Sequence, residues 1–412
     1  MLRDGRPAVL LSYAAFVWVG VSAGATGVLL LAQMNDYGVS RPTIGITFFT
    51  GALGFLLASL SNGALIARLG VRMALAAGGC ASTLAGLYLA TRPPFAAFLL
   101  VPLVSGFGAG VLESVLNVYL ASLPGATTLL NRLHAFFGVG ALLGPVLAAW
   151  IVGMAPWRVV SLVLALACVP LVAGFLAAYP RTLAAATPAP ESAPSATSGT
   201  PAEPASSLLG AALRDRGVLF GAAMLAVYVG IELGVGNWGF SYLVQARGLS
   251  ASLAGYAVSG YWLGLTAGRF LISPAADRIG ATTTAMMYAC LAGIAGAATL
   301  AWLAPSAVLA SAALALLGFC LAPVFPTTMS IAPRLTQARL APTAIGVMNA
   351  GSTVGGTALP WLAGTIAQSR GMWTLLPFTV TLALLQIAMW RPLAVRIRAP
   401  RRPLATANQS PS

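Results

Sequence analysis

Long apolar runs, separated by short polar or Gly/Pro-rich breaks, dominate this chain and restrict the folds open to it. Of its 412 residues, 58% are hydrophobic and only 7% are charged, whereas about a quarter of an ordinary soluble domain is charged. Such a chain has too little polar surface to present to water, which excludes a water-soluble globule. Because a helix that crosses a bilayer needs about 20 apolar residues, the runs are predicted to be membrane spans.

Twelve such spans are predicted, six in each half of the chain. They cover residues 8–33, 43–67, 73–90, 95–122, 134–154, 159–178, 218–244, 253–272, 282–303, 307–331, 344–367 and 373–390. The first run is far longer than the apolar region of a signal peptide and contains no small-residue cleavage site, so we expect it to be retained. The sequence therefore predicts an all-α membrane protein with twelve transmembrane helices.

The composition changes between the two halves. Residues 180–216 are rich in Pro, Ala and Ser, and this segment is too polar to span a bilayer or to pack in a core. It is predicted to be a flexible cytoplasmic linker. The resulting division is an N-terminal bundle at 1–179, a C-terminal bundle at 217–395 and a basic cytoplasmic tail at 396–412.

Short segments of the first half recur in the second half. Three of them recur 210 residues later: Gly38-Val-Ser40 as Gly248-Leu-Ser250, Leu53-Gly54 as Leu263-Gly264, and Ala67-Arg68-Leu-Gly70 as Asp277-Arg278-Ile-Gly280. Further along the chain the offset becomes 215, where residues 140–145 match residues 355–360. A parallel duplication of this kind predicts two six-helix bundles related by pseudo-twofold symmetry, with a site between them.

The basic residues indicate the orientation in the membrane. All 22 are arginine, and with eight acids they give a net charge of +14. They occur singly or in pairs rather than as a concentrated basic face, so no nucleic-acid partner is expected. With both termini inside, only five arginines lie outside and seventeen lie inside, which is a clear positive-inside bias. We therefore expect a multi-pass protein of the cell inner (plasma) membrane with both termini cytoplasmic. The five outside arginines are Arg41, Arg92, Arg158, Arg247 and Arg370.

No feature of the sequence indicates an enzyme. The four cysteines lie inside apolar runs without the spacing of metal ligands, so neither disulfides nor a bound metal is expected. No nucleophile–base pair, metal-ligand cluster or phosphate-binding loop is present, and we expect no catalytic residues and no cofactor.

Two acidic residues lie deep within predicted spans, where a charged side chain is costly. Glu113 lies in the fourth span with Asn117 one helical turn later, and Glu232 lies in the seventh span. Desolvation penalises the charged form of a carboxyl, so such groups can bind and release a proton as a cleft opens to each side in turn. We assign both acids to proton coupling. The alternative is a permanently protonated carboxyl that hydrogen-bonds a neighbouring helix.

Other polar residues within spans are candidates for substrate binding. His134, the one histidine, begins the fifth span and can donate a hydrogen bond to a solute. The structural alternative is that it caps the helix or acts as a buried hydrogen-bond donor. Asn349 and Thr353 occupy the matching place in the second half, where hydrogen bonds between helices are the alternative. The full set of predicted substrate-binding residues is Asn117, His134, Tyr228, Asn237, Trp238, Asn349 and Thr353.

The tenth span contains two prolines three residues apart, Pro323 and Pro326. Each removes a backbone donor from the helical ladder, and Thr327 or Thr328 can satisfy the freed groups. A bend is therefore predicted in this span.

The loops after the second and eighth spans carry related motifs. They read Gly63-Ala-Leu-Ile-Ala67-Arg68-Leu-Gly70-Val-Arg72 and Pro274-Ala-Ala-Asp277-Arg278-Ile-Gly280. Both resemble the signature loop Gly-x-x-x-Asp-Arg-x-Gly-x-Arg of the major facilitator superfamily of transporters, and the resemblance covers the chain from about residue 8 to residue 392. It implies that charges in these loops latch the inward-closed arrangement, although Ala67 replaces the first motif aspartate. Arg269 is expected to pair with Asp277. The residues assigned to gating are Arg68, Arg72, Arg269, Asp277, Arg278, Pro323 and Pro326.

Within that superfamily, three further segments resemble the fucose permease-like branch of sugar–proton symporters. They are Gly108-x-Gly110-x-x-Glu113-x-x-x-Asn117, Arg132-Leu-His134-Ala-Phe136 and Phe325-Pro326-Thr327. The resemblance implies a proton-coupling role for Glu113 and binding roles for Asn117 and His134. An aspartate that those symporters carry in the first span has no counterpart here, and Glu232 is the candidate to replace it.

The sequence thus predicts a monomeric secondary active transporter that moves a small neutral, sugar-like solute with protons. No basic residue is expected in the middle of a span, which argues against a strongly anionic solute. The alternative is a proton-driven exporter of drugs or metabolites with the same fold. It is favoured by Gly140-x-x-x-Gly144-Pro145, which resembles part of the antiporter motif of drug exporters, although Ala148-Ala149 stands where that motif prefers two glycines.

Overall fold

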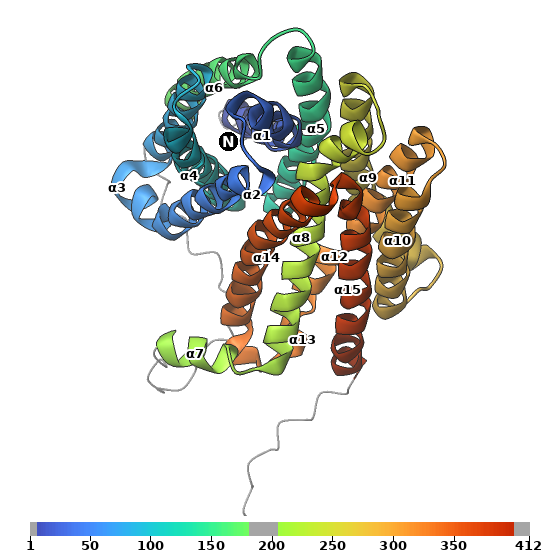
Figure 1. The fold of residues 1–412 in the computed structure, drawn as a ribbon. Coiled ribbons are helices and arrows are strands. Elements are labelled where there is room, and N and C mark those ends of the chain that lie inside the picture. The colour runs from blue at the N-terminus through green and yellow to red at the C-terminus, as the bar shows by residue number, and fades with distance from the viewer. Residues whose placement is uncertain (1–5, 181–204, 399–412) are drawn as a thin grey trace, which may run out of the picture.

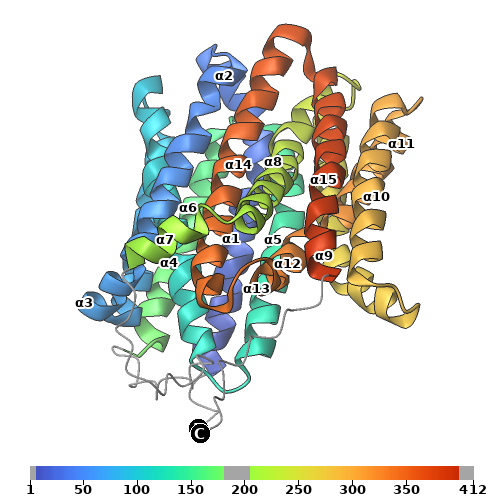
Figure 2. The ribbon, with the colours of Figure 1, turned by 90° about the horizontal axis from the view of Figure 1, so that it is seen from below.

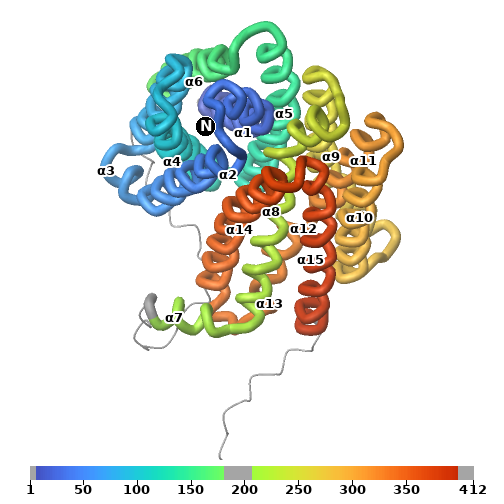
Figure 3. The backbone as a smooth tube through the Cα atoms, viewed as in Figure 1, coloured from blue at the N-terminus to red at the C-terminus, as the bar shows by residue number. Residues whose placement is uncertain are grey.

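The computed structural model describes residues 6–180 and 205–398, and these residues are almost entirely helical (Figure 1). The N-terminal half forms one group of helices and the C-terminal half forms a second group beside it, as the chain trace in Figure 3 makes clear. The predicted all-α fold of two helical bundles is confirmed. The N-terminal bundle contains α1 (Arg6–Tyr37), α2 (Arg41–Ile44), α3 (Ile46–Ala90), α4 (Phe95–Ala121), α5 (Ala126–Val152) and α6 (Arg158–Ala178).

The second half contains more separate helical segments than the first. They are α7 (Ala205–Ala212), α8 (Arg216–Gln245), α9 (Ala251–Arg278), α10 (Thr283–Leu303), α11 (Ala307–Leu321), α12 (Val324–Ser330), α13 (Ala332–Leu335), α14 (Ala341–Arg370) and α15 (Leu375–Arg398), with 3-10 turns at Ala338–Leu340 and Met372–Thr374. The extra segments are α7, which precedes the seventh predicted span, and α12 and α13, because the tenth predicted span divides into α11 and α12 and α13 follows it directly.

The helices account for all twelve predicted spans. In the part of the chain that the structure describes, nine helical stretches are long and apolar enough to cross a bilayer. One of them, Arg41–Ala90, contains two spans, because Gly70 adopts a φ of 73° and breaks the helical path inside α3. The two remaining spans are α9 and α14, which are less apolar on average.

The internal repeat predicted from the sequence is visible in the backbone. Ser40 and Ser250 each cap the N-terminus of the helix that follows them. Gly280 has a φ of 66°, close to the value at Gly70, its counterpart 210 residues earlier. Because a left-handed conformation favours glycine, the repeat preserves the residue type at both turns.

The packing within each bundle follows the same repeat. Helix α5 packs along α1, and α14 packs along α8. A methyl group built on Gly140 would overlap the carbonyl oxygen of Val17, and one built on Gly355 would overlap that of Ala226. Small residues therefore let the helices approach closely at equivalent places in both bundles.

The segment predicted to be a linker is partly helical. Helix α7 and the start of α8 lie within 180–216, whereas residues 181–204 lie outside the described residues. The Asp215 carboxylate caps α8 by accepting a hydrogen bond from the Gly217 N–H, and it also accepts one from the Thr336 hydroxyl at 2.7 Å. Its contact with Arg396 of α15, at 3.3 Å, shows that the helix continues into the predicted tail. Helix α7 and the first residue of α8 therefore lie within the predicted linker, and α15 extends into the predicted tail as far as Arg398.

The predicted bend in the tenth span is confirmed. Helix α11 ends at Leu321, and α12 begins at Val324 after Pro323. The buried Thr328 hydroxyl donates a hydrogen bond to the Val324 carbonyl oxygen at 2.7 Å. The bend places Phe325 against Tyr228 of α8, with 5.9 Å between the ring centroids.

The two bundles are joined at one end of the molecule. We call the end where α6 finishes and α8 begins the linker side, and the opposite end the far side. At the far side, the Arg41 guanidinium donates hydrogen bonds to Gln245 of α8 at 2.6 Å and to Gln368 of α14 at 3.1 Å. The Trp361 indole N–H donates to the Pro42 carbonyl oxygen. Figure 2 shows α2 beside the end of α14, so the far side is closed by direct contacts between bundles.

Candidate functional site

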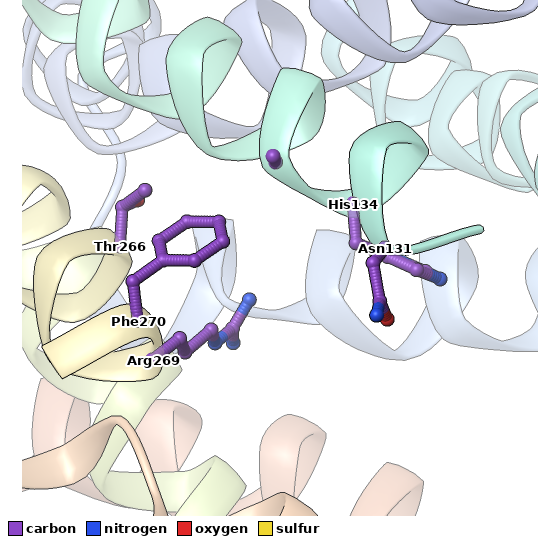
Figure 4. Close-up of a pocket in the computed structure, with 6 residues that line it drawn as sticks. Asn131, His134, Thr266, Arg269 and Phe270 are labelled. Carbon is purple, nitrogen blue, oxygen red and sulfur yellow. The ribbon is translucent and has the colours of Figure 1, made fainter. Parts of the chain in front are cut away.

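A cavity of about 260 Å³ lies between the two bundles, where α5 faces α9 (Figure 4). Asn131, His134 and Ala135 of α5 form one wall, and Thr266, Arg269 and Phe270 of α9 form the other. In Figure 4 the Arg269 guanidinium extends from α9 toward the wall that carries Asn131 and His134. The cavity therefore brings one cation and two polar side chains together from different bundles.

The position of the cavity follows from the packing of α5 on α9. The helices touch where Gly138 meets Thr266, and again nearer the far side where Gly255 meets Ala149. Thr266 forms the first contact, and the other lining residues lie on its linker side. The cavity is thus bounded by close contacts toward the far side, whereas Asn131, His134, Arg269 and Phe270 on its linker side are exposed.

Arg269 pairs with Glu232 of α8. The guanidinium Nη2 lies 3.8 Å from the Glu232 Oε1, and the side chains are 37% and 13% exposed, respectively. The acid is therefore nearly enclosed, whereas the arginine remains reachable from the cavity. The fully buried Tyr228 interacts electrostatically with both partners, and the Tyr261 hydroxyl donates to the Glu232 carbonyl oxygen at 3.0 Å.

This pairing corrects two predictions. Arg269 contacts Glu232 rather than Asp277, which is exposed and forms no ion pair with the described residues. The motif at the end of α9 suggested the wrong partner because sequence proximity does not decide which helix face a side chain occupies. With a rise of 1.5 Å per residue, Arg269 lies about 14 Å inside the linker-side end of α9. A cation therefore does line the cavity within a span, and the inference of a neutral solute loses its premise.

Glu113 occupies a different environment in the N-terminal bundle. It lies about 12 Å inside the linker-side end of α4, a depth similar to that of Arg269. The residue is half-buried and has no charged partner among the described residues. The Asn117 side-chain amide donates a hydrogen bond to the Glu113 backbone carbonyl oxygen at 2.8 Å, so this contact leaves the carboxyl free.

His134 combines access to the cavity with a defined contact to α1. Its ring packs edge-on against Phe16, with 5.6 Å between centroids, while the residue itself remains exposed. Exposure on the cavity wall keeps at least one face of the ring available to a solute.

Several predicted substrate-binding residues do not line this cavity. Trp238 is fully buried, donates its indole N–H to the Pro360 carbonyl oxygen and packs against Phe48, so it belongs to the contact between bundles. Asn237 is half-buried in the adjoining turn. Asn349 is exposed on α14, and the Thr353 hydroxyl donates to its carbonyl oxygen within the same helix.

The residues of the predicted loop latch do not contact one another in this arrangement. Arg68 and Arg278 are exposed, Arg72 is half-buried, and none of them pairs with a described acid. Their gating role stays a prediction, as does that of Pro323 and Pro326 at the bend. These loops lie at the linker side, opposite the closed far side.

Sequence reasoning did not single out Asn131, Thr266 and Phe270 as parts of the site. A helical spacing pattern was present, because Asn131 and His134 lie three residues apart, as do Thr266 and Arg269. Residues three apart share a helix face. An arginine within an otherwise apolar run was the stronger signal.

Comparison with known sequences shows the same family along the whole chain. The profile of the Major Facilitator Superfamily matches residues 11–255 and 237–411. The chain is 27% identical over 386 residues to "Bypass of stop codon protein 6" of Saccharomyces cerevisiae, covering 87% of this chain and 76% of that protein. Over shorter stretches it is 33% identical to the mouse (Mus musculus) "Sodium-dependent glucose transporter 1A", covering 35% of this chain and 34% of that protein. It is also 30% identical to a "Multidrug resistance protein B homolog" of Mycobacterium tuberculosis, covering 40% and 30%.

Solved structures share the fold at low sequence identity. The nucleoside transporter NupG aligns with a TM-score of 0.73 and 14% identity over 97% of this chain and all of that chain. A bacterial homolog of the lysosomal transporter Spinster, in an inward-facing conformation, aligns with a TM-score of 0.75 and 12% identity over 96% and 98%. The E. coli fucose:proton symporter aligns with a TM-score of 0.59 and 17% identity over 96% and 100%. This multi-pass membrane protein therefore belongs to the Major Facilitator Superfamily of transporters.

Proposed function

We propose that this protein is a secondary active transporter that moves a small polar, sugar-sized solute together with protons by alternating access. The observation that carries the proposal is the cavity between α5 and α9, which lies on the linker side of closed contacts between the bundles. A site that is reachable from one side and sealed from the other is what one half of an alternating-access cycle requires.

The polar groups in and near the cavity support a polar solute. Asn131, His134 and Thr266 offer donors and acceptors for hydroxyl groups, and Phe270 offers an apolar face. The volume of about 260 Å³ is close to the lower end of ordinary small-molecule sites, which suits a solute of about one sugar ring.

Proton coupling is assigned to Glu113 and Glu232. Ionisable residues within membrane spans are costly and usually functional. The Glu232 carboxylate contacts Arg269, which lines the cavity, and Glu113 lies in the other bundle at a depth similar to that of Arg269. Protonation of either carboxyl changes the charge that the bundles must carry when the cavity is sealed, so it biases the equilibrium between the two arrangements.

The arginine distribution supports a cytoplasmic linker side. With the termini inside, the far side carries only Arg41, Arg92, Arg158, Arg247 and Arg370. In this orientation the described arrangement faces inward. One chain contains both bundles and the cavity between them, which suits a protein that works as a monomer in the plasma membrane.

A proton-driven exporter is the second candidate. It is favoured by the similarity to the Mycobacterium tuberculosis multidrug resistance protein homolog and by Gly140-x-x-x-Gly144-Pro145 in α5. Four of the six lining residues carry hydrogen-bonding side chains, and this favours the first candidate: Asn131, His134, Thr266 and Arg269.

The two candidates separate in a reconstituted system. The purified protein would be placed in proteoliposomes with an imposed pH gradient, and the movement of labelled sugars, sugar acids and cationic dyes would be followed. Proton-driven accumulation of a sugar-class solute is the expected result. Transport of dyes alone would favour the exporter, and the absence of exchange for any solute by folded protein would overturn the transport proposal.

A further inference from the structure

Building on the proposed transport function, we propose that the solute carries a carboxylate on a sugar-sized polyhydroxy molecule, and that Arg269 binds this carboxylate between the two bundles. The inference comes from the placement of Arg269, which lies opposite Asn131 and His134 and next to Glu232. It fixes a property that the family and the fold leave open, namely the charge of the solute.

Arg269 is the single arginine among the residues that line the described cavity, and no lysine is present in the chain. A guanidinium presents several N–H groups in one plane, a geometry that matches the two oxygens of a carboxylate. Its side chain is 37% exposed, so part of this donor surface faces the cavity rather than the protein. The opposite wall supplies the Asn131 amide and the His134 ring for hydroxyl groups of the same solute.

The contact of Arg269 with Glu232 is loose. The nitrogen–oxygen distance is 3.8 Å, whereas charge-assisted hydrogen bonds are about 2.7–2.9 Å long. Glu232 therefore balances the charge of Arg269 without using its donors fully. An incoming carboxylate can take these donors with shorter contacts.

Charge balance then links the solute to the proton. When a solute carboxylate binds Arg269, Glu232 loses its counter-ion in a nearly enclosed position, where an unpaired charge is costly. Uptake of one proton by the Glu232 carboxylate removes that cost. The other ionisable groups around the pair are the hydroxyls of Tyr228 and Tyr261 and, across the cavity, His134. One anion and one proton thus bind together, and the net charge of the cavity stays the same.

A neutral sugar does not produce this coupling. It leaves the Arg269–Glu232 pair intact, so its binding does not raise the affinity of the Glu232 carboxylate for a proton. The arrangement therefore favours an acidic solute over its neutral parent.

The proposal is tested with matched probes in proteoliposomes that contain the full chain. D-glucuronate and D-gluconate are compared with D-glucose, and both labelled uptake and charge movement are recorded. Proton-driven uptake of a sugar acid without net charge movement is the expected result. Uptake of glucose with inward positive charge, and no uptake of either acid, would overturn the acidic solute while leaving the transport function intact. Uptake of none of the three overturns the acidic solute, and the separate dye and exchange assays then decide the transport function.

Variants of the pair sharpen the test. Arg269→Gln is expected to weaken sugar-acid binding roughly tenfold or more, because a charge-assisted contact is lost, and Arg269→Lys is expected to fall in between. The matched control is Arg391→Gln, an exposed arginine of α15 that does not line the cavity, which should leave binding unchanged. The same affinity in Arg269→Gln as in the unaltered protein would overturn the proposal.

Glu232→Gln gives a prediction of opposite sign. It removes the competing acid, so sugar acids are expected to bind more tightly and with little dependence on pH, as measured by the ligand-induced rise in melting temperature. Weaker binding in this variant would contradict competition at Arg269. The double variant Glu232→Gln/Arg269→Gln contains no unpaired charge, so it separates loss of binding from loss of folding.

Discussion

The two bundles differ most in how they hold their buried acids. Glu232 of the C-terminal bundle has Arg269 as a partner, which reaches the cavity, whereas Glu113 of the N-terminal bundle has no charged partner among the described residues. The two bundles share a repeated backbone scaffold, but only one of them pairs its buried acid with an arginine. We infer that the partnered acid responds to the solute, and that the isolated acid responds to the side of the membrane to which it is exposed.

The largest expected effect comes from the isolated acid. Glu113→Gln is expected to reduce uphill uptake to background and to leave solute exchange partly intact, because exchange needs no net proton movement. Counterflow and pH-driven uptake in proteoliposomes measure the two activities separately. If both activities survive, Glu113 has no part in the coupling, and the contrast between the bundles disappears.

The next effect concerns the contrast between the closed far side and the open linker side. Arg41→Ala removes two side-chain hydrogen bonds between the bundles, worth about 2 kcal/mol together, which is roughly a thirtyfold change in the ratio of the two arrangements. A cysteine placed at Asn131 in a background without native cysteines should then react several-fold more slowly with a maleimide added from the linker side. Arg370→Ala on the same side is the control. An unchanged labelling rate would show that the Arg41 contacts do not hold the far side closed.

Packing inside the two bundles should respond equally, because the close contacts are equivalent. Gly140→Ala and Gly355→Ala each place a methyl group against a backbone carbonyl oxygen of the neighbouring helix. Each is expected to destabilise the protein by about 1–3 kcal/mol, the usual cost of overpacking. The measurement is the midpoint of thermal unfolding. Gly346→Ala, in open space on the same helix as Gly355, should cause no loss, and unequal effects of the first two variants would show that the bundles are not equivalent here.

The smallest effect distinguishes the linker-side ends of the bundles. The N-terminal bundle is tied there by neutral groups, with the Tyr179 hydroxyl donating to the Ala8 carbonyl oxygen. The C-terminal bundle is tied by Asp215. Partial burial raises the pKa of this carboxyl. Hydrogen bonds from Thr336, the Gly217 N–H and Arg396 together lower it by more, so the net pKa lies below its usual 3.8.

The sign of the pH effect follows from that lowered pKa. The Asp215 carboxylate stabilises the folded state above about pH 4, and this contribution is lost as the pH falls through the lowered value. Asp215→Ala should therefore cost about 1 kcal/mol at pH 6, as for other helix caps, and the difference in melting temperature from the unaltered protein should shrink toward pH 3. Asp277→Ala, an exposed and unpaired acid, serves as the control. A difference that grows at low pH would contradict the assignment.

Hydropathy and the internal repeat were enough to predict the helices and their grouping. An apolar run long enough to cross a bilayer has few alternatives to a helix, and the repeated Gly70 and Gly280 mark equivalent turns at the same end of both bundles. The bend at Pro323 was also predictable, because proline acts on the backbone of its own helix.

The contacts between helices were not predictable in the same way. Helical spacing shows which residues share a face, but it does not show which other helix meets that face. For this reason Arg269 was assigned to the nearby Asp277 rather than to Glu232, 37 positions away. Trp238 was assigned to substrate although its indole is enclosed between bundles, because an aromatic ring within a span suits either role equally well.

The contact between Gly138 and Thr266 has a mechanical consequence. It joins the bundles beside the cavity, near the middle of both α5 and α9, so it would act as the pivot of the proposed rocking motion. Points close to a fulcrum travel little and points far from it travel widely. In the proposed cycle the side chains of Arg269 and His134 would therefore stay close to a bound solute, while the distant ends of the helices move apart or together.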